Sequence, residues 1–142
     1  MIIGLGSDLC NIERIAHSLE RFGERFEKRV FTDIERAKAG KRPFTRAGTY
    51  AKRFAAKEAF SKAVGLGMRS PMSWRAMQTL NDPSGKPIIK CSGQLQTFME
   101  ERYYTAQVSI TDEVDLAMAF VVVIYGTPVV TGVTDPKDLM GS

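Results

Sequence analysis

Residues 53–63 read Arg-Phe-Ala-Ala-Lys-Glu-Ala-Phe-Ser-Lys-Ala and lie in the strongest helical segment of the chain, which extends from Thr45 to Gly65. The high alanine content favours a helix, and the glycines that follow, Gly65 and Gly67, are typical of a helix C-terminus. Apolar residues lie on most sides of this helix, so few of its positions can face water. The helix is therefore expected in the interior of the molecule or at an interface.

Three charged residues interrupt this apolar helix, namely Lys57, Glu58 and Lys62. Glu58 and Lys62 are four residues apart and share a helix face, so one interpretation is an ion pair on a solvated surface. The apolar neighbours favour another interpretation, a carboxylate and an ammonium at a buried or interface site. Magnesium binds carboxylates together with phosphate oxygens and water, and lysine is a common partner of phosphate. These residue types suit phosphoryl chemistry, although their spacing alone does not prove it.

A second candidate lies near the start of the chain, where residues 2–9 form a short apolar run that includes Gly4 and Gly6. The run predicts a buried strand with close backbone neighbours. Asp8 stands at the carboxyl end of this strand. Taken alone, an aspartate in this position is more simply a turn or helix-capping residue than a catalytic one.

The rest of the pattern predicts an α+β fold, with helices packed on a mostly antiparallel sheet. Apolar residues at helical spacing cover residues 12–30, with Asn11 as a plausible N-cap and a break or bend expected at Gly23. The other expected elements are a short helix from Thr32 or Asp33 to about Gly40, strands at 73–80 and 86–91 around a turn at 81–85, a helix at 92–102, and strands at 106–111 and 116–125, the last of them central.

The composition is that of one soluble globular domain, with 142 residues, a net charge of +4, 44% apolar and 25% charged residues. We expect residues 1–126 to form this domain and 127–142 to form a weakly structured C-terminal extension. The longest apolar run, 116–125, is shorter than the ~20 residues of a membrane helix, and no signal peptide is recognisable, so we expect a cytoplasmic protein without membrane contact. Two isolated cysteines and a single histidine disfavour a zinc site. A chain of this length buries only about two-thirds of its unfolded surface, so a large site is expected at its edge or between subunits.

Two further features permit both a structural and a functional interpretation. The turn at 81–87, Asn-Asp-Pro-Ser-Gly-Lys-Pro, is either a plain hairpin turn or a loop whose amides and Lys86 meet a nucleotide phosphate, although it is not a Walker A loop. A basic stripe on the first helix is either a solvated face beside glutamates or a docking surface for an acidic helix. The stripe consists of Arg14, His17, Arg21, Arg25 and Lys28. The absence of a nucleic-acid-reading motif argues against a nucleic-acid partner.

Four segments of the chain together resemble the holo-[acyl-carrier-protein] synthases, a family of small phosphopantetheinyl transferases. The segments are Ile3-Gly4-Leu5-Gly6-Ser7-Asp8-Leu9; Glu20-Arg21-Phe22-Gly23-Glu24-Arg25-Phe26 with Arg29-Val30-Phe31-Thr32; residues 53–63; and Ser84-Gly85-Lys86-Pro87 with Val108-Ser109-Ile110-Thr111-Asp112. The resemblance covers about residues 1–125. Its most specific part is the helix at 53–63 in combination with the early Gly-x-Asp.

The resemblance implies an α+β homotrimer with an active site at each subunit interface. It implies that Asp8 and Glu58 hold Mg²⁺, with pyrophosphate oxygens of coenzyme A and water completing the shell, and that Lys62 contacts phosphate. The positions implied to lie near the nucleotide are Arg53, Lys62, Gly65, Gly67, Ser84, Gly85, Lys86 and Pro87. The positions implied to dock the acyl carrier protein are Arg14, Arg21 and Arg25.

The implied reaction is attack of a carrier-protein serine on the β-phosphorus of coenzyme A, with loss of adenosine 3′,5′-bisphosphate. The group that takes the serine proton is open between Glu58 and a metal-bound water. Many relatives carry histidines where this chain has Gln107 and Asp112, so a histidine base on that strand is excluded here. Asp112 remains a fallback acid or base, although a turn aspartate is the simpler interpretation.

Overall fold

A computed structural model of the chain describes residues 1–126, and the predicted extension at 127–142 lies outside the described residues. The α+β class is confirmed. The elements are β1 (Ile2–Asn11), α1 (Ile12–Phe22), α2 (Glu24–Val30), α3 (Asp33–Gly40), the 3₁₀ helix η1 (Pro43–Thr45), α4 (Arg46–Ala63), β2 (Met77–Asn81), β3 (Pro87–Cys91), α5 (Gly93–Glu101), β4 (Tyr104–Asp112) and β5 (Leu116–Tyr125). No helix in this described part is long and apolar enough to cross a membrane.

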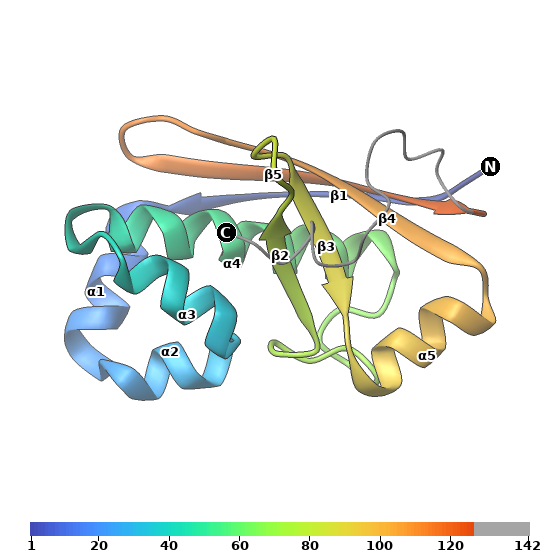
Figure 1. The fold of residues 1–142 in the computed structure, drawn as a ribbon, viewed down its shortest axis with the longest axis horizontal. Coiled ribbons are helices and arrows are strands. Elements are labelled where there is room, and N and C mark those ends of the chain that lie inside the picture. Colours follow the sequence, from blue (N-terminus) through green and yellow to red (C-terminus); the bar gives the residue numbers. More distant parts are fainter. Residues whose placement is uncertain (127–142) are drawn as a thin grey trace.

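The strands form two antiparallel sheets rather than one. The larger sheet has the order β1-β5-β4, so the strand predicted to be central, β5, is central. The smaller sheet is the β2–β3 hairpin, in which Met77 pairs with Cys91 and Asn81 with Pro87. α4 runs along one face of the larger sheet, α1, α2 and α3 gather towards one end of the molecule, and α5 lies towards the other (Figure 1).

The close approach of β1 to α4 depends on the two glycines near the start of the chain. A Cβ atom on Gly4 would lie 1.9 Å from the carbonyl oxygen of Ala63, and one on Gly6 would lie 1.9 Å from that of Ala59. The prediction of close backbone neighbours is therefore confirmed. The alanine-rich helix brings its own backbone near the sheet, and β5 completes this layer with small and branched residues that are fully buried, namely Ala117, Ala119, Val121 and Val123.

The prediction that β1 is a buried strand is wrong for the single chain. Alternate residues of β1 face away from α4, and Leu5 and Leu9 remain 55% and 63% exposed. On the neighbouring β5, Met118 and Phe120 continue the same outer face and are 39% and 38% exposed. The larger sheet thus buries one face against α4 and leaves an apolar outer face uncovered, because this chain contributes helices to one side only.

Local signals explain the boundaries of the helices. Asn11 caps α1 by accepting from the amides of Glu13 and Arg14, and Gly23, with φ at +56°, separates α1 from α2. Thr32 rather than Asp33 caps α3. The strand expected at 73–80 begins only at Met77, because residues 74–76 form a turn.

Candidate active site

Asp8 and Lys62 meet although 54 residues separate them in the chain. Asp8 lies on the face of β1 that packs against α4, and its Oδ1 is 3.3 Å from the Lys62 Nζ. Lys62 Nζ also donates to the Ser7 carbonyl oxygen at 3.1 Å. Strand β1 and the last turn of α4 position these groups, because the close packing at Gly4 and Gly6 fixes the strand on the helix.

Glu58 stands one helical turn before Lys62 and is half-buried. Burial raises the pKa of its carboxyl, the negative charge of Asp8 raises that pKa further, and Lys62 and Arg14 oppose the shift. Among the described residues, the ion-pair partner of Lys62 is Asp8 and not Glu58, so the simple i,i+4 pair is not what the structure contains. Two carboxylates and one lysine therefore share a site between β1 and α4.

This site suits a hard divalent cation that other ligands help to bind. The charge of Asp8 disfavours ionisation of Glu58, and a bound cation would offset that repulsion; oxygen donors are the ligands of Mg²⁺. The described residues contain no group of three or more metal-ligating side chains, so the remaining ligands have to come from water or substrate. That composition is the usual one for Mg²⁺ bound together with phosphate oxygens. Gly65 and Gly67, with φ at +79° and +60°, follow α4 immediately beyond Lys62.

Arg53 belongs to a second group, on the side of α4 that faces the β2–β3 hairpin. Its side chain is 5% exposed and donates to the Thr49 carbonyl at 3.4 Å and to Asn81 Oδ1 at 3.3 Å. Its Nε is buried without a hydrogen-bond partner among the described residues. Lys38 Nζ donates to the same Asn81 oxygen at 2.8 Å. Three cationic side chains and the hairpin turn surround a hollow of about 210 Å³, lined by Lys38, Thr49, Lys52, Arg53, Thr79, Asn81, Gly85, Pro87, Ile110 and Asp112.

The turn of the hairpin is held together from within. Asp82 Oδ1 accepts from the Ser84 amide at 2.9 Å, the Ser84 hydroxyl at 2.6 Å and the Lys86 amide at 2.9 Å. These hydrogen bonds, with the Ser84 hydroxyl first, lower the pKa of Asp82. The Gly85 amide donates to the Asp82 carbonyl. The three amides of this turn thus already have acceptors within the turn, which favours the interpretation as a plain hairpin turn, and the Lys86 side chain is exposed.

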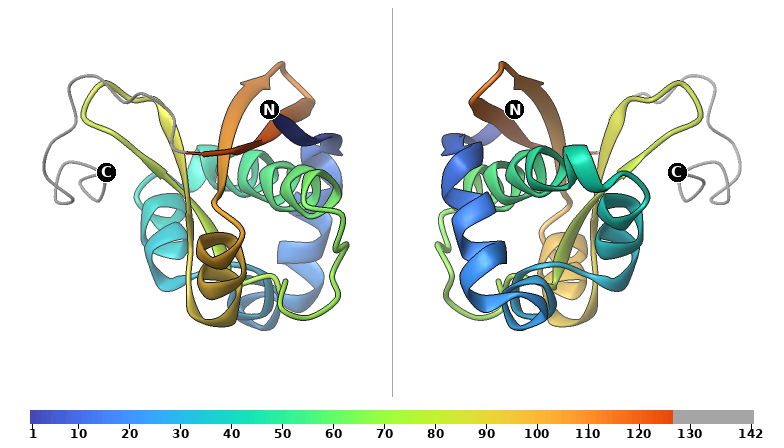
Figure 2. Two further views of the ribbon diagram at one scale, coloured as in Figure 1. Left: turned by 90° about the vertical axis from the view of Figure 1, so that its right-hand side faces the viewer. Right: turned by 90° about the vertical axis from the view of Figure 1, so that its left-hand side faces the viewer.

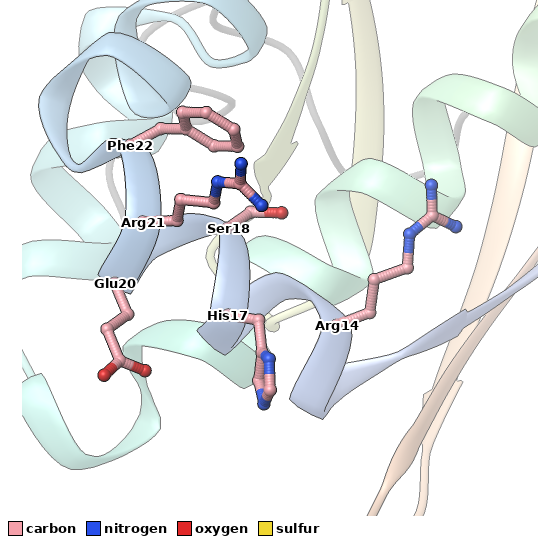
Figure 3. A pocket seen from close by; sticks show the side chains of 6 residues that line it. All are labelled: Arg14, His17, Ser18, Glu20, Arg21 and Phe22. Atoms are coloured by element: carbon pink, nitrogen blue, oxygen red, sulfur yellow. The ribbon is translucent and has the colours of Figure 1, made fainter.

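The basic stripe is divided between two helices. Arg14, His17 and Arg21 lie on α1 and line a hollow of about 500 Å³ with Ser18, Glu20 and Phe22, whereas Arg25 lies on α2, beyond the break at Gly23. The Arg21 guanidinium lies 5.4 Å from the Phe22 ring centroid, and Phe22 is 46% exposed. Figure 3 shows that Arg14 points towards α4, where its guanidinium is 5.8 Å from the Phe54 ring.

The structure does not bring all of the predicted site residues together within one chain. Asp8, Glu58 and Lys62 gather at β1, whereas Arg53, Gly85 and Pro87 line the hollow at the hairpin. β1 forms one edge of the larger sheet, whereas the hairpin lies beyond the opposite edge, next to β4 (Figure 2). Gln107 is exposed on the outer face of β4, and Asp112 lines the hairpin hollow.

Several residues of the hairpin hollow were not found from the sequence, notably Lys38, Thr49, Lys52 and Asn81. A usable signal existed, because residues 38–53 contain six lysines and arginines and no acidic residue. Such a run indicates an anion-binding surface. The sequence does not show that α3, α4 and the hairpin carry these side chains to one place.

Comparisons with known proteins show the family and the fold of the chain. The model of the 4′-phosphopantetheinyl transferase superfamily matches residues 4–121. The holo-[acyl-carrier-protein] synthase of Sphingopyxis alaskensis is 58% identical over 128 residues, which cover 87% of this chain and 96% of the relative. The crystal structure of the Neisseria meningitidis synthase superposes with a TM-score of 0.82 at 37% identity and covers 87% of this chain and 99% of its own. The Bacillus anthracis synthase, solved in complex with CoA (3′,5′-ADP), superposes with a TM-score of 0.73 at 34% identity. That match covers 87% of this chain and 96% of the relative.

The chain therefore belongs to the 4′-phosphopantetheinyl transferase superfamily and, within it, to the holo-[acyl-carrier-protein] synthase family. It is an enzyme of the transferase class, as the resemblance predicted.

Proposed function

We propose that this enzyme transfers the 4′-phosphopantetheine group from coenzyme A to a serine of an apo-acyl carrier protein, with release of adenosine 3′,5′-bisphosphate. The observation that carries the proposal is the meeting of Asp8, Glu58 and Lys62 between β1 and α4 in a chain of this family. The Bacillus anthracis and Helicobacter pylori relatives were solved with coenzyme A or its nucleotide part bound. We place the reaction in fatty acid biosynthesis in the cytoplasm, on the strength of the family.

Asp8 and Glu58 are the residues that would hold Mg²⁺. The bound cation would supply positive charge that neutralises the pyrophosphate of coenzyme A. Lys62, held beside Asp8, is placed to contact a phosphate oxygen of the same substrate. Glu58 is our candidate for the group that takes the serine proton, because its carboxylate lies beside Asp8 and Lys62, where the pyrophosphate would be held.

The hairpin hollow is our candidate site for the nucleotide part of coenzyme A. Within residues 1–126 the Nε of Arg53 has no hydrogen-bond partner there, and Lys38 and Lys52 add positive charge. Desolvation lowers the pKa of Arg53 and disfavours its charged form, so an anion that paired with it would relieve a cost already present in the fold. Ser84, Gly85, Lys86 and Pro87 form the adjoining turn, and the Lys86 side chain is available for phosphate.

A site completed between two subunits would bring together the two groups of predicted site residues, which lie apart in one chain. The cluster around Asp8 and the hollow around Arg53 lie on different sides of one chain, and the larger sheet leaves an apolar outer face at Leu5, Leu9 and Phe120. Exposed apolar patches of this kind mark interaction surfaces. We propose a homotrimer in which this face is covered and the hairpin of one subunit completes the site at β1 of its neighbour.

We further assign docking of the acyl carrier protein to Arg14 and Arg21 on α1 and to Arg25 on α2. Arg14 has a favourable position for this role, because its side chain extends from α1 to Phe54 on α4 and its charge acts on Glu58. A basic surface next to the site steers an acidic partner and orients it.

Mass spectrometry of the carrier protein tests the proposed function. Incubation with the enzyme, Mg²⁺ and coenzyme A should add the mass of one phosphopantetheine to the apo-carrier, and replacement of the carrier serine by alanine should abolish the gain. EDTA should also stop the reaction, and excess Mg²⁺ should restore it. An unchanged mass with an intact carrier serine would refute the proposal.

A further inference from the structure

Lys57, the neighbour of Glu58 in the sequence, is completely buried and takes no part in the site described above. Its side chain is 0% exposed, and its ammonium lies 2.8 Å from Glu35 Oε1. It donates to the Trp74 carbonyl at 2.7 Å and also to the Met77 carbonyl. All three donors of the ammonium therefore have acceptors, as a buried cation requires.

Glu35, the partner of Lys57, is also 0% exposed and serves three segments at once. Its Oε1 accepts from the Thr32 amide at 3.0 Å and so completes the capping box at the start of α3. Its Oε2 accepts from the Thr79 amide in β2 at 3.3 Å. A single carboxylate thereby joins the first turn of α3, the middle of α4 and the first strand of the hairpin.

These contacts determine where the hairpin lies on α4. Lys57 holds the chain at Trp74 and Met77, immediately before and at the start of β2, and Glu35 holds β2 again at Thr79. Two residues further along, Asn81 meets the Arg53 guanidinium at 3.3 Å, one helical turn before Lys57. The position of the turn at 81–87 relative to Arg53 is therefore set by Lys57 and Glu35.

Stability alone is a poor explanation for an ionic pair in this place. Desolvation lowers the pKa of Lys57, and Glu35 is the chief group that opposes this shift and favours the charged ammonium. Replacing a buried ion pair by apolar groups of similar volume is often neutral or stabilising, whereas removing one partner is costly. An apolar pair cannot form directional hydrogen bonds. Lys57 donates to two carbonyls and Glu35 accepts from two amides, and these bonds fix the position of the segments that carry them.

We propose that the Lys57–Glu35 pair is a positioning device for substrate, which holds the hairpin turn at the distance from Arg53 that the nucleotide of coenzyme A requires. The inference rests on the proposed function, because it takes the hairpin hollow as the nucleotide site. Both residues act through the hairpin and touch no substrate themselves. Their loss should weaken the binding of coenzyme A and leave the carrier-protein surface on α1 intact.

The decisive variant combines Lys57→Met with Glu35→Gln. It preserves volume and leaves no unpaired charge, so it avoids the destabilisation expected of Lys57→Met alone. We expect the KM for coenzyme A to rise about tenfold or more, with kcat and the KM for the carrier protein within about threefold of the wild type. Glu35→Gln alone keeps Lys57 and preserves the volume of the side chain at position 35. It should also raise the KM for coenzyme A, and it serves as the test if the double variant does not fold.

Tyr50→Phe is the matched control. Tyr50 is a fully buried residue of α4 that donates its hydroxyl to Glu27, which ties α4 to α2 instead of to the hairpin. This variant should lose stability while its KM for coenzyme A stays unchanged. An unchanged KM for coenzyme A in the double variant, or equal changes in the double variant and the control, would overturn the inference.

Calorimetric titration of coenzyme A separates this inference from the proposed function. A wild type that binds coenzyme A but never modifies the carrier protein would contradict the function. The ratio of the dissociation constants of wild type and variant would still decide the role of the pair, with a rise of about tenfold supporting it and a ratio near one opposing it.

Discussion

At the scale of the residue, Glu58 combines a proposed role in function with a cost to the fold. Its carboxyl is half-buried beside Asp8, and both burial and the neighbouring charge raise its pKa. In the absence of metal, the ionised form is therefore less favourable in the folded protein than in the unfolded chain. Groups with such perturbed ionisation are common in active sites, because function retains a charge that stability would remove.

Glu58→Gln should therefore lower activity without lowering metal-free stability. We expect transferase activity to fall by about 10²-fold or more, since a ligand of the cation and the candidate base are lost together. In EDTA at pH 7, the Tm of the variant should equal or exceed that of the wild type. Because the pKa of Glu58 is raised in the folded state, the wild-type protein loses stability as the pH rises above the unfolded-state pKa of about 4.3. The variant has no carboxyl at this position and does not show this loss.

The pH dependence provides the check on this assignment. The difference in Tm between variant and wild type should disappear below about pH 4, where the glutamate is protonated in both states. Mg²⁺ together with coenzyme A should raise the Tm of the wild type more than that of the variant. Glu101→Gln, at an exposed position on α5, should show neither effect. A variant that keeps wild-type turnover would contradict the role of Glu58.

At the scale of the element, the packing of β1 on α4 brings the site residues together. The strand can approach the helix backbone only because Gly4 and Gly6 carry no side chain. That approach places Asp8, two residues after Gly6, beside Lys62 on the following turn of α4. A wider spacing between strand and helix would separate the two carboxylates that we assign to the cation.

Gly6→Ala should destabilise the protein by about 2–4 kcal/mol, because its Cβ would overlap the Ala59 carbonyl and the backbone would have to move. Gly48→Ala is the matched control within α4. Its Cβ would find its nearest neighbour at 4.0 Å, the Cδ1 of Ile12, so the alanine should stabilise the helix by up to about 1 kcal/mol. Urea unfolding measures both free energies. A loss at Gly6 within about 0.5 kcal/mol, the range of ordinary surface changes, would show that the approach is not constrained.

At the scale of the whole molecule, one chain exposes the apolar outer face of its larger sheet. Phe120 lies in the middle of this face, opposite Ser7 on β1 and Ser109 on β4, and is 38% exposed. The candidate site is likewise divided between β1 and the hairpin, as expected if the proposed trimer covers this face and completes the site.

Phe120→Lys should therefore dissociate the proposed trimer without unfolding the chain. A lysine at this position is exposed in the monomer but would be buried in the assembly, where an unpaired charge costs several kcal/mol. Light scattering should give about three times the chain mass of 15.8 kDa for the wild type and the single mass for the variant. Activity should fall with the loss of the assembly. Gln94→Lys on the exposed start of α5 should leave both unchanged, and an active wild-type monomer would contradict the interface site.

Much of the fold could be predicted from the sequence, because its signals are local. Periodicity predicted the helices and strands, glycine at 23 predicted the break between α1 and α2, and the central position of β5 followed from its continuous apolar run. The errors came where a tertiary contact replaced a local preference. Residues 73–76 had the composition of a strand, but Trp74 lies in a turn, and its carbonyl oxygen accepts a hydrogen bond from Lys57.

The sequence by itself determined the family, since Asp8, Glu58 and Lys62, to which we assign the chemistry, stand in motifs specific enough to indicate it. Only the tertiary structure decided how they are used. It paired Lys62 with Asp8 instead of Glu58, engaged the amides of the 82–86 turn with Asp82, and buried Lys57 against Glu35. The physical reason is that ion pairing and burial depend on distances between segments far apart in the chain, and periodicity along the sequence carries no information about those distances.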